Sequence, residues 1–350
     1  MNTQVRHITD FIHQWAPPEI KMSYDNVGLL IGDSTSPVSR VLVCLDVTEE
    51  IVDEALDKKC ELIVSHHPLI FQNISRINPS DEQGRIIYKM IQNNIALLSA
   101  HTNLDAALDG VSFVLANNLG LDNLQFLDKS YPISKKITLT TDFEDSEAVL
   151  KLMNYYSAEE AYFYAVDGRK NDLKCFEATI DRHNVGQLKT ALQKEGLLKS
   201  GTFQVTDMAS PSDNFGMGVI GKYPDEGIAM EEFLHLVCRA LDVNAVRLSG
   251  SSKRIKQVAV CGGAGISLKK RAIAAGADAF VTSDIKYHEY FTEKKDFLLI
   301  DAGHYESEFP VVEAIRKELS EAFEELHVEA TECVSNPMKI YVSDFNNKTI

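Results

Sequence analysis

The sequence lacks the long apolar runs that define membrane proteins and secretory leaders. None of its hydrophobic stretches approaches the ~20 consecutive apolar residues that cross a bilayer. The first segment, MNTQVRHITDFIHQW, is polar and charged throughout, so it has no apolar core of a signal peptide. We therefore expect a cytoplasmic protein without a membrane partner.

Cysteine pairs are also missing, because the six cysteines are scattered and no two are spaced as C-x-x-C. This spacing argues against a zinc ribbon, a thioredoxin-like motif and a disulfide framework. We expect buried, reduced thiols instead. The cysteines are Cys44, Cys60, Cys175, Cys238, Cys261 and Cys333.

The sequence has fewer lysine and arginine residues (35) than aspartate and glutamate residues (51). The formal net charge is −16, and no run of lysine and arginine is long enough to neutralise several phosphates, so nucleic acid is not an expected partner. A composition with 45% hydrophobic and 25% charged residues is ordinary for a soluble globular protein. A chain of 350 residues exceeds what one core usually serves, which predicts at least two domains.

Strand-like and helix-like segments alternate in the first third of the chain. Short apolar runs rich in branched residues predict buried parallel strands, and amphipathic segments predict helices between them. The predicted strands are 41–47, 61–67 and 95–102, and the predicted helices are 48–59, 82–94 and 110–120. Thr48 is either the cap of its helix or a polar group of a site, and Gly120 ends the last of these helices.

The last third repeats this plan. Its predicted strands are 257–263, 277–284 and 297–304, its predicted helices are 267–276, 285–294 and 307–323, and 327–334 is a candidate edge strand. The two similar βαβαβα halves predict an α/β core. They form either one domain with an internal pseudo-repeat or two similar lobes.

The pattern changes between the two halves to β-α-β-β-α-β, the order of a ferredoxin-like unit. The predicted elements are strand 135–141, helix 146–156, strands 159–166 and 173–180, helix 184–195 and strand 201–207. Polar segments on either side, 122–132 and 207–214, are interpreted as linkers. We therefore expect a first core half at 1–127, an inserted α+β domain at 128–213 and a second core half at 214–350.

Three predicted strands end in groups that can ligate metal. In an open α/β sheet, functional side chains gather beyond the carboxyl ends of the parallel strands. ELIVS runs into a histidine pair, IALLSA into H-x-x-x-D, and FLLIDAG into H-x-x-x-E. The donors are His66, His67, Asp105, His304 and Glu308, with His101 beside them.

The spacing of these donors predicts two metals. Adjacent residues of an extended chain point in opposite directions, so one ion cannot easily take both His66 and His67. Residues four apart at a helix start share a face, and a carboxylate can bridge two cations. His101 is either a ligand or a neighbour that orients Asp105 or a water. Imidazole and carboxylate without thiolate favour zinc, iron, manganese, cobalt or nickel.

Further polar groups stand at equivalent strand ends. Lys286 and His288 follow the strand 277–284, where they could hold an anion and move a proton, or simply begin a solvated helix. The glycines of CGGAGIS (261–267) could cradle a phosphate or form a tight turn. Asp25 and Asn26 could serve a turn or line a pocket.

Several segments together resemble the NIF-three-like dinuclear metal-centre family, whose members are often called GTP cyclohydrolase I type 2 homologues. The segments are WAPPEIKMSYDNVGLLIGD, LIVSHHPLIF, LLSAHTNLDAALDGV, VAVCGGAG, TSDIKYHE and LIDAGHYESE. They span nearly all of 1–127 and 214–350. The combination of HHPLIF, HTNLD and GHYESE is highly specific.

The resemblance implies metal ligation by the same five residues, two ions per chain and a toroidal homohexamer with its metal sites facing an inner cavity. It also implies that the insert is similar to PII and CutA proteins. Two function hypotheses follow. One is a hydrolase that uses two divalent ions (zinc, iron or manganese) on a nucleotide-like or phosphorylated molecule, with His101, Lys286 and His288 as catalytic candidates. The other is a non-enzymatic metal-binding or regulatory protein that acts through its insert.

Overall fold

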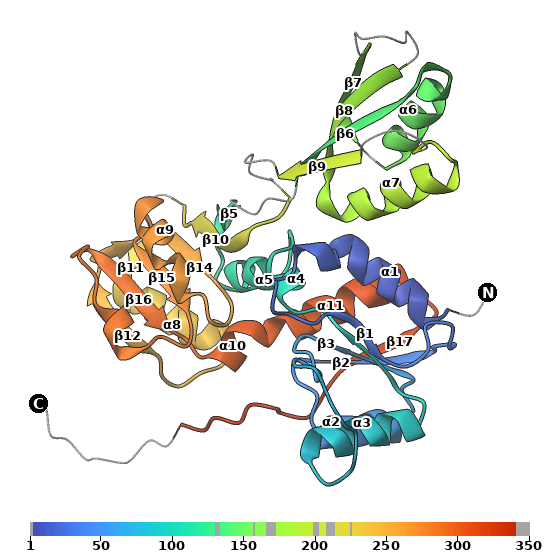
Figure 1. The fold of residues 1–350 in the computed structure, drawn as a ribbon. Helices are drawn as coiled ribbons and strands as arrows, with labels where there is room; N and C mark the ends of the chain where they lie inside the picture. The colour runs from blue at the N-terminus through green and yellow to red at the C-terminus, as the bar shows by residue number, and fades with distance from the viewer. Residues whose placement is uncertain are drawn as a thin grey trace, which may run out of the picture. The chain divides into compact units, whose positions relative to one another are not determined.

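The computed structural model describes residues 3–129, 134–156, 158–165, 173–198, 203–207, 214–224 and 226–340. These form a mixed α/β fold with parallel and antiparallel sheets (Figure 1). The chain divides into two compact units. Unit 1 comprises residues 1–6, 29–99 and 312–350, and unit 2 comprises residues 7–28 and 100–311.

Unit 1 is built on a five-stranded sheet in the order β1-β4-β3-β2-β17. Strands β2 (Arg40–Cys44), β3 (Leu62–Ser65), β4 (Ala96–Ser99) and β17 (His327–Ala330) are parallel neighbours, and β1 (Gly28–Ile31) completes the sheet. The central strands are buried along their whole length, as their unbroken apolar runs predict. Their register aligns Cys44, Ser65 and Ser99, so the three carboxyl ends lie at one edge.

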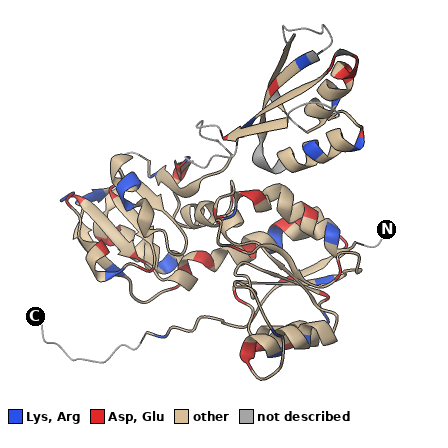
Figure 2. Ribbon diagram, viewed as in Figure 1, with Lys and Arg blue, Asp and Glu red and all other residues tan. Residues whose placement is uncertain are grey.

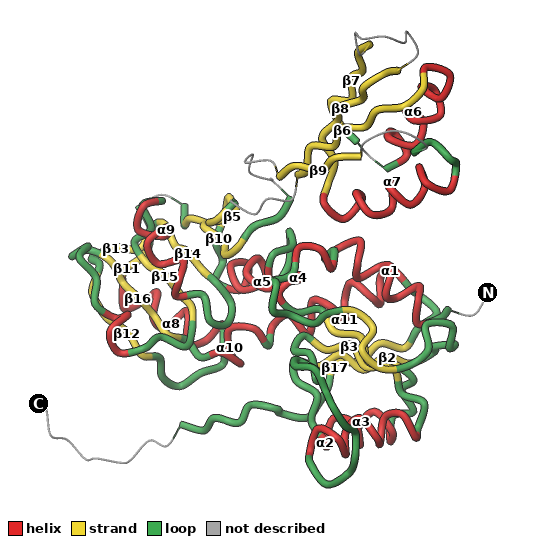
Figure 3. The backbone as a smooth tube through the Cα atoms, in the orientation of Figure 1, coloured by secondary structure: helices red, strands yellow, loops and turns green. Residues whose placement is uncertain are grey.

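Helices cover both faces of this sheet. Helix α2 (Glu49–Asp57) and helix α3 (Glu82–Gln92) lie together on one face, and α11 (Pro310–Ala322) lies on the other (Figure 3). Ile51, Ile87 and Met90 of α2 and α3 pack with Leu42 and Ile63 of the strands. The hydroxyl of Thr48 accepts the amide hydrogen of Ile51, which confirms its capping role.

Unit 2 contains a six-stranded sheet in the order β12-β16-β15-β14-β10-β5. Strands β14 (Gln257–Val260), β15 (Ala279–Thr282) and β16 (Phe297–Asp301) are parallel, whereas β12 (Arg247–Ser251), β10 (Met217–Lys222) and β5 (Asp122–Asp128) pair antiparallel with their neighbours. Helices α5 (Val111–Asn118) and α8 (Met230–Ala240) pack in one hydrophobic cluster with this sheet, and α9 (Lys269–Ala274) in another. Strands β2, β3 and β4 thus lie in one sheet and β14, β15 and β16 in another.

Three local predictions differ from the structure. Residues 122–128, interpreted as linker, form the edge strand β5. Residues 285–294, predicted as a helix, form only the short 3₁₀ turn η4 (Tyr287–Tyr290). The ammonium of Lys269 donates to the carbonyls of Glu289 (2.5 Å) and Phe291 (3.0 Å), so these two carbonyls have partners without a helical ladder. The candidate edge strand is confirmed as β17, but it joins the first sheet rather than the second.

The middle of the chain follows the predicted order of elements. They are β6 (Ser134–Asp142), α6 (Ser146–Tyr155), β7 (Glu159–Ala165), β8 (Leu173–Asp181), α7 (Arg182–Lys194) and β9 (Phe203–Asp207). The antiparallel sheet has the order β7-β8-β6-β9, and side chains of both helices pack in one core with it. Residues 130–133, 166, 201–202 and 208–213 of the predicted strands and linkers lie outside the described residues.

Charges of both signs are interspersed along the helices and strands, as Figure 2 shows.

Among the described residues, no helix is both long and apolar enough to cross a membrane. All six cysteines are free, and four of them are buried, in agreement with the expectation of reduced thiols.

Candidate metal centre

His66 and His67 follow β3 in unit 1. Their amides donate to the carbonyls of Cys44 (3.1 Å) and Leu45 (2.8 Å), so the parallel ladder continues past the end of the strand. His66 is fully buried, and the two rings lie 5.0 Å apart between centroids, tilted by 44°. Ser65 fixes the turn by donating to the carbonyl of His67 (2.8 Å). The sheet therefore holds two imidazoles with distinct orientations at one strand end.

A carboxylate of the neighbouring strand end orients His67. Nδ1 of His67 lies 2.7 Å from Oδ1 of Asp46, and the other oxygen of Asp46 accepts a hydrogen bond from Ser335 (2.6 Å). A carboxylate on Nδ1 keeps the hydrogen there and directs the lone pair of Nε2 outward, as in metal-bound histidines. Asp46 follows strand β2, and nothing in its sequence context assigns it this role.

His304 and Glu308 of unit 2 share a face of the short helix α10 (His304–Glu308), which confirms the prediction from their spacing. Nε2 of His304 lies 3.1 Å from Oε2 of Glu308, and Nδ1 of His304 lies 2.7 Å from Oδ2 of Asp284. The hydrogen bond to Glu308 and the nearby carboxylate charges raise the pKa of His304 to about 9, against the lowering effect of burial. A proton held between an imidazole and a carboxylate occupies a position that a cation could take.

Asp105 ends the short helix α4 (Thr102–Asp105). The negative charges of Asp105 and Glu308 both act on the buried thiol of Cys261. Burial, with contributions from these two carboxylates, raises the pKa of Cys261 to about 12. Without a metal ion the thiol therefore stays protonated at neutral pH, and among the described residues it is not a donor of the groups that could hold an ion. This agrees with a donor set of imidazole and carboxylate.

The glycines after β14 are required by the packing of Glu308. A Cβ on Gly263, which has φ +59°, would lie 2.0 Å from Oε1 of Glu308. The amides of Gly263 and Gly265 donate to the hydroxyls of Ser307 (3.0 Å) and Thr282 (2.9 Å). These two amides are engaged within the protein, so the loop acts as a close-packed turn that seats Glu308 rather than as a phosphate cradle.

His101 has its own carboxylate partner. Its Nδ1 lies 2.9 Å from Oδ1 of Asp25, and Oδ2 of Asp25 accepts from the amide of Thr102 (3.0 Å). Burial would raise the pKa of Asp25, but the hydrogen bonds from His101 and Thr102 hold it far below its usual range. Asp25 also accepts the amide of Asn26 (2.8 Å), so it serves both the turn and the histidine.

Lys286 and His288 lie at η4, and both are exposed. The amide of Lys286 donates to the carboxylate of Glu289 (2.8 Å), and the ring of His288 contacts that of Tyr287. Among the described residues, the donors of the groups that could hold a metal ion do not include these two. Those donors are His66 and His67 of unit 1 and His101, Asp105, His304 and Glu308 of unit 2.

The model of the Duf34/NIF3 (NGG1p interacting factor 3) family matches residues 3–337 of this chain. A Staphylococcus aureus protein named GTP cyclohydrolase 1 type 2 homolog is 33% identical over 91% of this chain and 94% of its own length. A Staphylococcus epidermidis protein of the same name is 30% identical over 98% of both chains.

Two solved structures are similar in both sequence and fold. A Staphylococcus aureus protein has a TM-score of 0.78 at 30% identity, covering 97% of this chain and 99% of its own. A Bacillus cereus protein described as related to NIF3 has a TM-score of 0.76 at 28% identity, with the same coverage. The shared fold and the match over nearly the whole sequence show that the chain belongs to the Duf34/NIF3 family.

Proposed function

We propose that this chain is a dinuclear metal-binding protein and a metal-dependent hydrolase of a nucleotide-like or phosphorylated small molecule. Its ligands are His66, His67, Asp105, His304 and Glu308, and they bind two divalent ions of zinc, iron or manganese. The names of the relatives, GTP cyclohydrolase 1 type 2 homologs, support a substrate of this class.

The pairing of histidine Nδ1 atoms with carboxylates is the observation that carries the proposal. His67 is paired with Asp46, and His304 with Asp284, at 2.7 Å in both cases. Such pairs fix the tautomer and raise the basicity of a ligating imidazole. The same arrangement on two sheets favours two preorganised ligands over two surface ion pairs.

Bound divalent ions would supply Lewis-acid activation of water and of a substrate oxygen. The protein's own groups then position the reactants and move protons. His101, with Nδ1 on the carboxylate of Asp25, presents Nε2 as a donor or acceptor of a proton. The exposed ammonium of Lys286 pairs with an anionic part of the substrate, and His288 beside it is the alternative proton carrier.

The insert, at 128–213, is proposed to be a ferredoxin-like domain similar to PII and CutA proteins, between core halves at 1–127 and 214–350. The strand order β7-β8-β6-β9 and a core shared by the sheet and both helices support this assignment. The assembly is proposed to be a toroidal, cytoplasmic homohexamer, as the family resemblance suggests.

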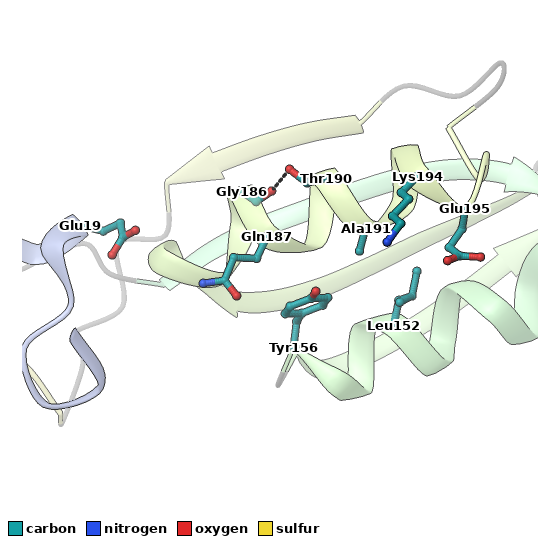
Figure 4. Close-up of a pocket in the computed structure, with 9 residues that line it drawn as sticks. All are labelled: Glu19, Leu152, Tyr156, Gly186, Gln187, Thr190, Ala191, Lys194 and Glu195. Atoms are coloured by element: carbon teal, nitrogen blue, oxygen red, sulfur yellow. Dashed lines mark hydrogen bonds between the residues drawn. The ribbon is translucent and has the colours of Figure 1, made fainter. Parts of the chain in front are cut away.

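A groove on the insert favours a second candidate, a non-enzymatic metal-binding or regulatory protein. The pocket has a volume of about 760 Å³ and is lined by side chains of α6 and α7 and by Tyr156, which follows α6. Figure 4 shows Tyr156, Gln187 and Lys194 among them. Mixed polar and aromatic linings are suited to small-molecule ligands. A ligand bound there would regulate the protein without being hydrolysed.

Metal analysis and a substrate screen test the first candidate. The full-length protein, purified without chelator, should contain close to two metal ions per chain and hydrolyse GTP or a phosphoester. His66→Ala and Glu308→Ala should lose metal and turnover. The exposed His235→Ala and Glu318→Gln are matched controls and should retain both.

The outcomes separate the candidates. Two metals with no turnover on any substrate would favour the regulatory protein. A metal content well below two per chain would refute the dinuclear centre itself.

A further inference from the structure

A pocket of about 350 Å³ lies in unit 2 where η4 meets the edge strand β12. This volume is at the lower end of the range for small-molecule sites. Its lining residues are Arg247, Leu248, Ser249, Tyr287, Tyr290 and Phe291.

Large apolar side chains around this pocket are exposed to solvent. Tyr287 is 73% exposed, Phe291 66% and Leu248 41%. The rings of Tyr287 and Phe291 meet edge to face, with centroids 5.6 Å apart and planes at 78°. Solvated aromatic faces at the mouth of a pocket are suited to a planar ring, which would stack on one and contact the edge of the other.

A buried carboxylate organises the polar wall of the pocket. The side chain of Asp301 is only 2% exposed, and its Oδ2 accepts hydrogen bonds from Arg247 (2.5 Å) and from the hydroxyl of Tyr290 (3.0 Å). Arg247 uses one N–H of its planar fork in this contact, and the guanidinium is otherwise largely exposed. A fixed guanidinium beside aromatic rings fits a ligand that is both flat and anionic.

Both walls of the pocket connect directly to the helix that carries His304. Oδ1 of Asp301 accepts the amide of Gly303 (3.3 Å), the residue before His304. On the other wall, Tyr287 follows three residues after Asp284, whose carboxylate holds Nδ1 of His304. The pocket therefore shares with the helix of His304 two supporting groups, the carboxylate of Asp301 and the segment from Asp284 to Tyr287.

We propose that this pocket binds a nucleotide, with the base against Tyr287 and Phe291 and a phosphate oxygen on the guanidinium of Arg247. The assignment rests on the proposed function, because it defines the substrate-binding part of that hydrolytic site. It adds the recognition of an aromatic base, which the metal ligands by themselves do not provide.

Calorimetric titration of the full-length protein with GMP, AMP, CMP and UMP tests the proposal. At least one nucleotide should bind, and ribose 5-phosphate should bind at least tenfold more weakly because it has no ring to stack. Tyr287→Ala and Phe291→Ala should each weaken nucleotide binding about tenfold. Tyr155→Ala removes a tyrosine that is 76% exposed on α6 and should leave binding unchanged. Arg247→Gln should weaken binding of the nucleotide but not of its nucleoside.

These measurements are independent of the metal. His66→Ala, which is expected to lose metal, should still bind the nucleotide, so a failed hydrolase assay does not decide the question. The proposal is overturned if no nucleotide binds, if ribose 5-phosphate binds equally well, or if the Tyr287 and Phe291 variants bind like the wild type. A change of oligomeric state in these variants without nucleotide binding would instead identify the surface as a contact between copies.

Discussion

The two units present their candidate metal donors by different structural means. Unit 1 presents adjacent histidines at a strand end, where the continuing parallel ladder holds their backbone. Unit 2 presents His304 and Glu308 from one turn of helix, seated against a glycine turn that has no room for a side chain. Rigidity comes from backbone hydrogen bonds in the first case and from close packing in the second. Different substitutions should therefore disrupt the donors of unit 1 and the donors of unit 2.

Gly263→Ala should have the largest effect, because it disrupts the packing that unit 2 depends on. The new methyl group would overlap Oε1 of Glu308 at 2.0 Å, and φ +59° adds backbone strain of about 1 kcal/mol or more. Metal bound per chain, measured by mass spectrometry, should fall at least tenfold, and the melting temperature should drop.

Gly276→Ala is the matched control for this substitution. Gly276 also has a positive φ, of +85°, but its added Cβ would meet only the side-chain nitrogen of Gln257, at 3.8 Å. It should lower the melting temperature through strain and leave the metal content intact. Equal losses of metal in both variants would mean that strain, not the seating of Glu308, explains the effect.

Asp284→Asn and Asp46→Asn should have intermediate effects, and they compare the two units directly. Each substitution removes the negative charge that orients a histidine through Nδ1, which typically weakens metal affinity roughly 10–100-fold. We expect the greater loss for Asp284→Asn. The ring of His304 contacts a carboxylate at each nitrogen, Asp284 at Nδ1 and Glu308 at Nε2, so its orientation depends on these side chains. The backbone ladder holds His67 even when Asp46 is replaced. Competition with a chromogenic chelator measures both affinities, and wild-type affinity in either variant would remove that aspartate from the site.

The smallest effect concerns the acid stability of unit 1. Burial would raise the pKa of Glu54, but hydrogen bonds from Lys58, Thr331 and the amide of Glu332 lower it to about 2. The carboxylate therefore stabilises the fold above pH ~4.5, and this contribution is lost as the pH falls towards 2. Solvent near Lys58 screens the pair, so we expect about 1–2 kcal/mol.

Denaturant unfolding of Glu54→Gln tests this prediction. The variant should be less stable than the wild type at pH 7, and the difference should shrink as the pH falls below 4.5 and vanish only below pH 2. Glu318→Gln, at an exposed position of α11, should show no such pH dependence. A difference that is the same at pH 3 as at pH 7 would assign the stabilisation to something other than the charge of Glu54.

Sequence patterns by themselves predicted the central strands and the candidate donors. Apolar runs identified β2, β3 and β4 because strands buried on both faces need hydrophobic side chains at every position. Helical spacing identified the shared face of His304 and Glu308, since residues four apart meet on one side of a helix. These features depend on neighbouring residues only.

Tertiary structure decided the hydrogen-bond partners and strand pairings that involve residues far apart in the sequence. Asp25 lies 76 positions before His101, yet it is the carboxylate that orients that ring. The segment 122–128 becomes a strand because β10 offers it an edge, and β17 joins the first sheet because β2 does. In the segment 285–294, which forms no long helix, the carbonyls of Glu289 and Phe291 accept hydrogen bonds from Lys269 of α9. Local periodicity does not predict such partners, because each pairing forms only when the chain has folded. The candidate donors could therefore be predicted from the sequence, whereas the aspartates that contact three of the histidines could be found only in the fold.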